Sequence, residues 1–322
     1  MTLVLSSIPS PSFNSIDLGP VHLRLYGLCI AVGVLVAVSV AGRRWEARGH
    51  DRNDIGYLAT WAVPAGVIGA RAYHVATDWK TYFGTGGHPI DSLKIWQGGL
   101  GIPGGVALGV IVGVLVARRK GLSGLALMDT VAPALPIAQA IGRLGNWFNQ
   151  ELFGRPTRLP WALRIDAAHR PLGYEQFTTF HPTFLYEALW NLALASALIV
   201  LDRRKRLRRG ELFTLYVLGY SLGRLWVEDL RIDHASLIFG VRINIWMSAI
   251  VLVVTLVVFA TRHRRPLDAD VDPAAESAPG ADGADGAATE DQGPVPGTDA
   301  PATASAATSG DDGPDRPADP PA

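Results

Sequence analysis

The stretch IGRLGNWFNQELFGRPTR, residues 141–158, places charged and amide side chains where an apolar run should be finishing. Its polar members, set among glycines, are Arg143, Asn146, Asn149, Glu151 and Arg155. A charged side chain inside a bilayer costs at least about 2.5–3.5 kcal/mol on insertion scales. The stretch therefore predicts a functional site near the end of a membrane helix.

The rest of the chain supports a membrane protein. Of its 322 residues, 48% are hydrophobic and 18% charged, which is too apolar for an ordinary soluble domain of this length. Apolar runs long enough to cross a bilayer cover residues 23–42, 55–74, 101–117, 124–142, 183–201, 212–229 and 244–261. The second, fourth and sixth runs are the less purely apolar. The prediction is an all-α integral membrane protein with seven transmembrane helices.

Basic residues predict the orientation, because Lys and Arg concentrate in cytoplasmic connections. They cluster in residues 43–52, 118–120, 203–209 and 262–265, which all fall on one side of a seven-helix topology. The N-terminus then lies outside and the C-terminus in the cytoplasm. We expect three parts: an extracytoplasmic segment 1–22, a transmembrane domain 23–265 with a small extracytoplasmic arm at 143–182, and a cytoplasmic tail 266–322.

The predicted tail is acidic and lacks the means to build a core. From residue 266 onward it holds 13 Asp or Glu against the single Arg316, so the body carries a charge of about +12 and the tail about −12. Ala, Gly, Pro, Asp and Thr dominate it, and it has no aromatic residue. Too little surface can be buried there to offset the entropy of ordering, so we expect disorder.

Polar residues of several spans fall at the outer leaflet. Arg224, Glu228 and Arg231 share one helix face by their spacing. A guanidinium suits phosphate oxygens, and Glu228 can orient Arg224. Taken singly, a structural ion pair or an arginine reaching toward head groups is an alternative. Together with Arg143 from another span, these residues favour an anionic head group held at the outer leaflet.

Three further features bear on that site. Gly142 and Gly145 predict a break in the helix at Arg143. The glycines of GGLGIPGG, residues 98–105, allow either a re-entrant backbone or close helix packing. HPTFLYE, residues 181–187, adds two titratable groups, His181 and Glu187. No metal-ligand spacing, catalytic triad order or phosphate-binding loop occurs in the sequence, so we expect no metal, no cofactor and no nucleic-acid partner.

These blocks resemble a known family. GRLGNWFNQELFGRP, residues 142–156, is similar to the signature of the prolipoprotein diacylglyceryl transferases, and LRLYGL (23–28), HPTFLYE and GRLWVEDLR (223–231) resemble further blocks of that family. The resemblance spans about residues 20–260. It implies a multi-pass enzyme of the bacterial cell (inner or plasma) membrane. Such an enzyme transfers the diacylglyceryl group of phosphatidylglycerol to the lipobox cysteine thiol of a preprolipoprotein, forming a thioether and releasing glycerol 1-phosphate, the first step of lipoprotein maturation.

The resemblance also implies site residues. The catalytic set is Arg143, Arg224, Glu228, Tyr26, Asn146, Glu151 and Gly154. We expect Arg143 to bind the lipid phosphate, with Arg224, Asn149 and His181 as further substrate-binding residues. Many family members carry a histidine where this chain has Pro103, which leaves the base for the thiol open among Glu151, Glu228, His181 and the effect of nearby arginines on the thiol itself.

Two other classes of protein could use the same arginines: a transporter for an anionic solute, and a binding protein or scaffold that holds a lipid without turnover. Transporters usually place their site near the bilayer midplane between repeats. Here the charges gather at one leaflet and the sequence shows no repeated halves, which favours a lipid-modifying enzyme.

Overall fold

The computed structural model describes residues 7–19, 21–95, 98–204 and 207–263. The predicted tail, residues 266–322, lies outside the described residues, as do the first six residues of the predicted segment 1–22.

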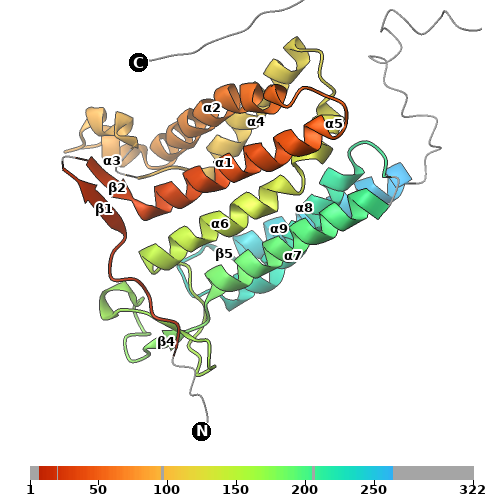
Figure 1. Cartoon of the computed structure of the whole chain (residues 1–322). Coiled ribbons are helices and arrows are strands. Elements are labelled where there is room, and N and C mark those ends of the chain that lie inside the picture. Colours follow the sequence, from red (N-terminus) through yellow and green to blue (C-terminus); the bar gives the residue numbers. More distant parts are fainter. Residues whose placement is uncertain (1–6, 20, 96–97, 205–206, 264–322) are drawn as a thin grey trace, which may run out of the picture. The chain divides into compact units, whose positions relative to one another are not determined.

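Each of the seven apolar runs lies in a helix, and the fourth run in two (Figure 1). The bounds are α1 Leu25–Glu46, α2 Asn53–Thr77, α4 Ile102–Arg119, α5 Gly124–Val131, α6 Ala134–Asn149, α7 Thr183–Arg204, α8 Glu211–Leu230 and α9 Ile243–His263. By length and composition α1, α4, α7 and α9 can cross a membrane, and α5 with α6, bent by 44° at their junction, make a fifth candidate span. The mainly helical membrane class is confirmed. α2 and α8 do not meet the length and composition expected of a membrane-spanning helix. They contain two of the three runs that were predicted to be less apolar.

The connections between these helices contain short elements that the sequence analysis did not predict. They are the helices α3 Trp79–Phe83, η1 Pro89–Leu93 and η3 Ala167–His169, and the strands β1 Ser15–Leu18, β2 Val21–Arg24, β3 Leu163–Arg164, β4 Thr179–Phe180, β5 Leu237–Ile238 and β6 Val241–Arg242. The strands pair consecutively into three antiparallel two-stranded sheets. A sheet this small has little stability of its own, so it depends on the helices beside it.

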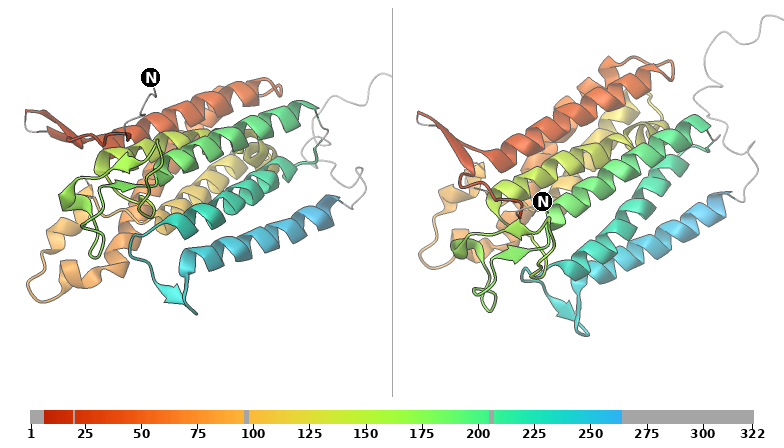
Figure 2. Two further views of the ribbon diagram at one scale, coloured as in Figure 1. Left: turned by 90° about the horizontal axis from the view of Figure 1, so that it is seen from below. Right: turned by 60° about the horizontal axis from the view of Figure 1, so that its bottom comes forward.

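The order in which the helices contact one another brings distant segments together. α1 packs on α6, α6 on α7, α7 on α8 and α8 on α9, while α2 packs on α4 (Figures 1 and 2). Because α6, α7 and α8 are neighbours that alternate in direction, the end of α6, the start of α7 and the end of α8 meet. We call this end of the helices the arm end, since residues 150–182 join α6 to α7 there.

The outer faces of the helices are apolar and uncovered. None of the apolar window of α9 is buried within the chain, and 6% of that of α4 is. A helix that is apolar on its exposed side requires a non-aqueous surrounding. These faces therefore suit contact with lipid.

The predicted helix break at Arg143 is wrong. α6 continues through Arg143 to Asn149, and the chain turns only at Gln150, whose φ is 50°, and Leu152, whose φ is 57°. The glycines serve close packing instead. A Cβ added to Gly142 would lie 3.2 Å from Ile30 Cδ1, and one added to Gly145 would lie 2.5 Å from Tyr26 Cδ2, so both glycines let α1 approach α6.

Gly145→Val is expected to destabilise the protein by about 1–3 kcal/mol, since a larger side chain must displace Tyr26, including its backbone 3.1 Å away. The measurement is thermal unfolding of purified protein in detergent. Gly56→Ala is the matched control, because nothing lies within 4 Å of a Cβ at that helical position. Equal unfolding temperatures for the two variants would show that the close approach of α1 is not tightly constrained.

The GGLGIPGG segment is explained by helix packing. A Cβ on Gly104 would lie 2.3 Å from the carbonyl oxygen of Gly69, so α2 and α4 touch through their backbones. Gly98 and Gly99, just before α4, have φ of 96° and 73°, which favours glycine. Arg71 of α2 holds this loop: its Nη1 donates to the Gly98 and Gly99 carbonyls at 2.6 and 3.0 Å.

Opposite the arm end, ion pairs tie the helices together. Arg44 and Arg48 of α1 both pair with Asp202 of α7 at 3.1 Å. Asp129 of α5 accepts backbone N–H bonds from Gly210 and Phe213 at the start of α8, at 2.6 and 2.9 Å. Carboxylates are favourable at a helix N-terminus. Two of the basic residues used to predict the cytoplasmic side thus also fix α1 against α7.

Candidate functional site

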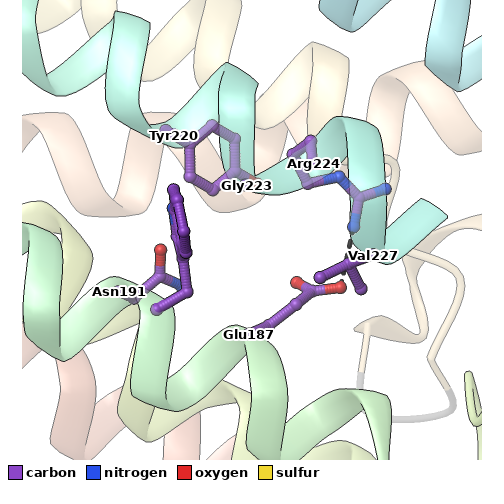
Figure 3. A pocket seen from close by; sticks show the side chains of 7 residues that line it. Glu187, Asn191, Tyr220, Gly223, Arg224 and Val227 are labelled. Carbon is purple, nitrogen blue, oxygen red and sulfur yellow. Dashed lines mark hydrogen bonds and ion pairs between the residues drawn. The ribbon is translucent and has the colours of Figure 1, made fainter.

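Glu187 joins the two arginines that the sequence analysis placed in one site. Arg143 of α6 approaches Glu187 Oε2 with Nη2 at 2.5 Å, and Arg224 of α8 donates from Nη1 to Glu187 Oε1 at 2.9 Å. Figure 3 shows the Glu187 carboxylate from α7 directed at the Arg224 guanidinium. Three helices therefore contribute one charged group each to a single cluster at the arm end.

Both arginines keep donors for a ligand. Their side chains are 20% and 15% exposed, while the Glu187 side chain between them is only 7% exposed. A guanidinium carries five N–H donors. Arg143 contacts Glu187 and Asn146, and Arg224 contacts Glu187 and Glu228, so neither uses all its donors on the described residues. An anion that reaches the cluster can bind both guanidinium groups.

Glu228 is the most buried charge of the cluster. Its side chain is 0% exposed. It accepts bonds or ion pairs from the described residues Arg224 (2.5 Å), Arg231 (3.4 Å), Arg242 (2.9 Å) and Asn244 (2.9 Å). A buried carboxylate needs such partners to offset its desolvation. Glu228 therefore fixes Arg224 and ties the end of α8 to the segment that leads into α9.

Asp233 completes this side of the cluster. Arg231 binds it with both Nε and Nη2, at 2.7 and 2.9 Å, and Arg242 binds it at 3.1 Å. Burial acts to raise the pKa of Asp233, but these two ion pairs outweigh burial and hold the pKa below its usual value. The carboxylate therefore stays ionised at neutral pH and both pairs persist.

A second chain of contacts runs from Arg143 toward the arm. Arg143 donates to Asn146 Oδ1 at 3.3 Å, and Asn146 donates to Glu151 Oε1 at 2.7 Å. Tyr26 of α1 interacts electrostatically with Glu151, Arg143 and Asn146. Six of the seven predicted catalytic residues are thus close together: the arginines Arg143 and Arg224, and around them Glu228, Asn146, Glu151 and Tyr26. Asn149 lies near this chain, because it lines a hollow together with Glu151.

Gly154 and His181 lie in the arm. The Gly154 N–H donates to the His181 carbonyl at 2.9 Å, and Gly154 pairs with Arg231 as an isolated antiparallel bridge. A Cβ on Gly154 would lie 2.9 Å from His181 Cβ and 3.0 Å from the Leu230 carbonyl oxygen. Gly154 therefore lets the arm close onto the end of α8.

The His181 side chain has its own set of contacts. Trp161 Nε1 donates to the Tyr186 hydroxyl at 3.0 Å, and the same hydroxyl is hydrogen-bonded with His181 Nδ1 at 3.1 Å. Burial, and then the charge of Arg155, lower the pKa of His181 below its usual value. The imidazole is therefore mainly neutral at neutral pH. No described contact joins it to Arg143 or Arg224, so the structure does not bring it into the arginine cluster.

The cavity next to the Glu187–Arg224 contact is too small for a lipid. It measures about 10 Å³ and lies between α7 and α8, where Asn191 and Tyr220 line it (Figure 3). A volume of that size holds one water molecule at most. A ligand must therefore reach the arginines from outside the α7–α8 contact.

Four residues of the cluster were missing from the predicted site: Glu187, Asp233, Arg242 and Asn244. Glu187 was noted as titratable, but nothing in the sequence says that α7 lies between α6 and α8. Arg242 ends β6, and Asn244 lies in the first turn of α9. Basic residues are usually in excess in cytoplasmic connections, so an arginine beside an apolar helix on the predicted outer side is unusual. That signal could have identified Arg242.

Comparison with known proteins gives consistent results. The model of the family described as "Prolipoprotein diacylglyceryl transferase" matches residues 14–261. A protein of Frankia alni named phosphatidylglycerol–prolipoprotein diacylglyceryl transferase is 54% identical over 278 residues, covering 86% of this chain and 73% of its own length. Proteins with the same name from Rhodococcus jostii and Cutibacterium acnes are 52% and 51% identical, covering 81% and 80% of this chain and 77% and 88% of their own lengths.

Proposed function

The chain belongs to the prolipoprotein diacylglyceryl transferase family, and on this premise we propose how its residues transfer the diacylglyceryl group of phosphatidylglycerol to a lipobox cysteine. It is a membrane transferase of lipoprotein biosynthesis. One observation carries the proposal for the site: Arg143 and Arg224, from separate helices, both contact the buried carboxylate of Glu187.

Arg143 and Arg224 hold the phosphate of phosphatidylglycerol. Glu187 sets the spacing between the two guanidinium groups, and Glu228 fixes Arg224 from the other side. In the transfer step negative charge develops on the departing phosphate, and cations held in place before the reaction stabilise that charge with little reorganisation.

The nucleophile is the thiol of the incoming peptide. Its sulfur attacks the glyceryl carbon that bears the phosphate, the C–S bond forms, and the C–O bond breaks with its electron pair staying on the phosphate. We assign the thiol proton to Glu151. Glu228 is fully buried among four donors and His181 lies apart from the arginines, whereas Glu151 is bound on one oxygen by Asn146 and faces a hollow. The nearby arginines favour the thiolate.

For the topology we propose seven spans with the arm end outside the bacterial cell membrane and the C-terminus in the cytoplasm. The basic clusters support it, as does the position of the charged cluster at the arm end. α2 and α8, the spans below the compositional criterion, each pack against an apolar neighbour, α4 and α9, that can cover them in the bilayer.

Purified full-length protein in nanodiscs that contain phosphatidylglycerol, mixed with a synthetic lipobox peptide, tests the function. We expect a mass gain of one diacylglyceryl group on the peptide cysteine, and none on a peptide with serine in its place. Lipid binding without any mass gain would point instead to a binding protein or scaffold.

Truncation after Arg265 is expected to leave peptide lipidation within about twofold of the full chain, because the composition of residues 266–322 gives them no means of building part of a packed site. Initial rates of both proteins at equal membrane content provide the comparison. A loss of activity on truncation would assign the tail a role in the reaction.

A further inference from the structure

A hollow lies on the arm side of the arginine cluster. It measures about 410 Å³ and is lined by Asn14 and Ser15 at the start of β1, Arg24 at the end of β2, and Asn149 and Glu151 at the end of α6. Its walls supply amide, hydroxyl, carboxylate and guanidinium groups. Such a lining suits a small polar molecule that carries hydroxyls and a negative charge.

Arg24 differs from the arginines of the cluster. Arg143, Arg224, Arg231 and Arg242 each contact a carboxylate. Arg24 is exposed, and within the described part of the chain no carboxylate pairs with it. The donors of the Arg24 guanidinium are therefore available to a ligand at the hollow.

The Arg24 guanidinium has a defined place. Its Nη1 lies 3.2 Å from where a Cβ of Gly98 would be, so the absence of a side chain at Gly98 makes room for it. Arg71 holds Gly98 in turn, because its Nη1 donates a hydrogen bond to the Gly98 carbonyl at 2.6 Å. The loop that precedes α4 thus forms a fixed surface beside Arg24.

The hollow is joined to the phosphate site. Glu151, which lines the hollow, is bound by Asn146, and Asn146 is bound by Arg143. A lipid whose phosphate lies at Arg143 and Arg224 keeps its acyl chains in the bilayer. Its head-group glycerol must then extend away from the chains, toward the arm end where the hollow lies.

Cleavage changes the charge of the head group. The phosphodiester of the lipid carries one negative charge, and the phosphate monoester released from it carries nearly two at neutral pH, since its second pKa is about 6. The cluster arginines are already matched by carboxylates. The additional negative charge on the released phosphate monoester therefore favours its movement toward Arg24, with which no carboxylate of the described residues pairs.

We propose that this hollow is the exit site for glycerol 1-phosphate, in which Arg24 binds the phosphate of the leaving group and the side chains of Asn14, Asn149 and Glu151 bind its hydroxyls. The inference rests on the proposed function. The exit step itself makes and breaks no bond, because by then the C–O bond has broken at the arginine cluster and Glu151 has taken the thiol proton.

Arg24→Gln in the full chain tests the assignment through product inhibition. Initial rates of peptide lipidation are measured with phosphatidylglycerol at increasing concentrations of added glycerol 1-phosphate. We expect the inhibition constant to rise by about tenfold, the loss of one charge-assisted contact. The ratio kcat/KM for phosphatidylglycerol changes much less, because Arg143 and Arg224 hold the uncleaved phosphate. Arg158→Gln, at an exposed arginine of the arm, is the matched control and leaves both values unchanged.

A second variant tests the charge without removing the arginine. Ser15 lies opposite Arg24 in the β1–β2 register, so Ser15→Asp places a carboxylate across the ladder from the guanidinium. This carboxylate neutralises Arg24 and is expected to raise the inhibition constant as Arg24→Gln does. Ser15→Ala, which adds no charge, keeps the wild-type value.

Titration of glycerol 1-phosphate into the protein in phosphatidylcholine nanodiscs separates binding from turnover. Binding that weakens in both Arg24→Gln and Ser15→Asp supports the exit site, even if the wild-type protein lipidates no peptide, in which case the proposed function alone fails. An unchanged affinity for glycerol 1-phosphate in both variants overturns the exit site. If both variants lost affinity equally for phosphatidylglycerol and for glycerol 1-phosphate, Arg24 would be assigned to lipid binding. That result would also overturn the exit site.

Discussion

Arg143→Ala is expected to lower the rate of peptide lipidation by about two to three orders of magnitude, the cost of removing one prearranged charge at a developing oxyanion. Arg224→Ala is expected to have a similar effect, because each guanidinium contacts Glu187 and each supplies donors to the same phosphate. The measurement is the initial rate at saturating peptide, by mass spectrometry.

Charge-preserving and distant variants complete this experiment. Arg143→Lys keeps the charge but not the planar set of donors, so we expect partial activity only. Arg158→Ala, at an exposed position of the arm, should retain full activity. Membrane fractionation checks that each variant inserts. Normal turnover in both alanine variants at normal insertion would remove the phosphate role from these arginines.

Glu228→Ala is expected to reduce stability by about 3–5 kcal/mol, the usual effect of breaking a buried ion pair by deleting one partner. The variant leaves Arg224, Arg231 and Arg242 without their shared carboxylate in a place where Glu228 itself is 0% exposed. We therefore expect lower yield and a lower unfolding temperature in detergent, together with loss of activity as Arg224 loses its orientation.

Asp229→Asn provides the comparison one residue away. Asp229 pairs with Arg155, but their side chains are 68% and 53% exposed, and exposed pairs contribute about 0–1 kcal/mol. Its unfolding temperature should stay close to that of the unmodified protein. If Glu228→Ala and Asp229→Asn unfolded at the same temperature, the ion pairs around Glu228 would contribute no more to stability than the exposed Arg155–Asp229 pair.

The sequence predicted the helices well because the signal for each is local. An apolar run of bilayer length is recognisable without knowledge of its neighbours, and all seven runs lie in helices. The less apolar runs were also recognised: α2 and α8 do not qualify as membrane spans, and the α5–α6 pair qualifies only as one span bent by 44°. The hairpins in the connections were missed, since strands of two to four residues carry almost no periodic pattern.

The site was only partly predictable, because it depends on which helices touch. Arg143 and Arg224 were expected to meet and do so through Glu187, a residue whose role requires α7 to lie between α6 and α8. The prediction of a helix break at Arg143 was wrong for a related reason. Glycines at a helix end look like a break in sequence, but here they make room for α1, and packing between helices is not visible in one segment.

The central claim is that one phospholipid phosphate lies between Arg143 and Arg224. An experimental structure of the full chain in nanodiscs with phosphatidylglycerol, and with a lipobox peptide whose cysteine is replaced by serine, tests it most directly. The account predicts a single phosphate in hydrogen-bonding contact with both guanidinium groups while Glu187 still bridges them. A bound lipid whose phosphate contacts neither arginine would contradict it.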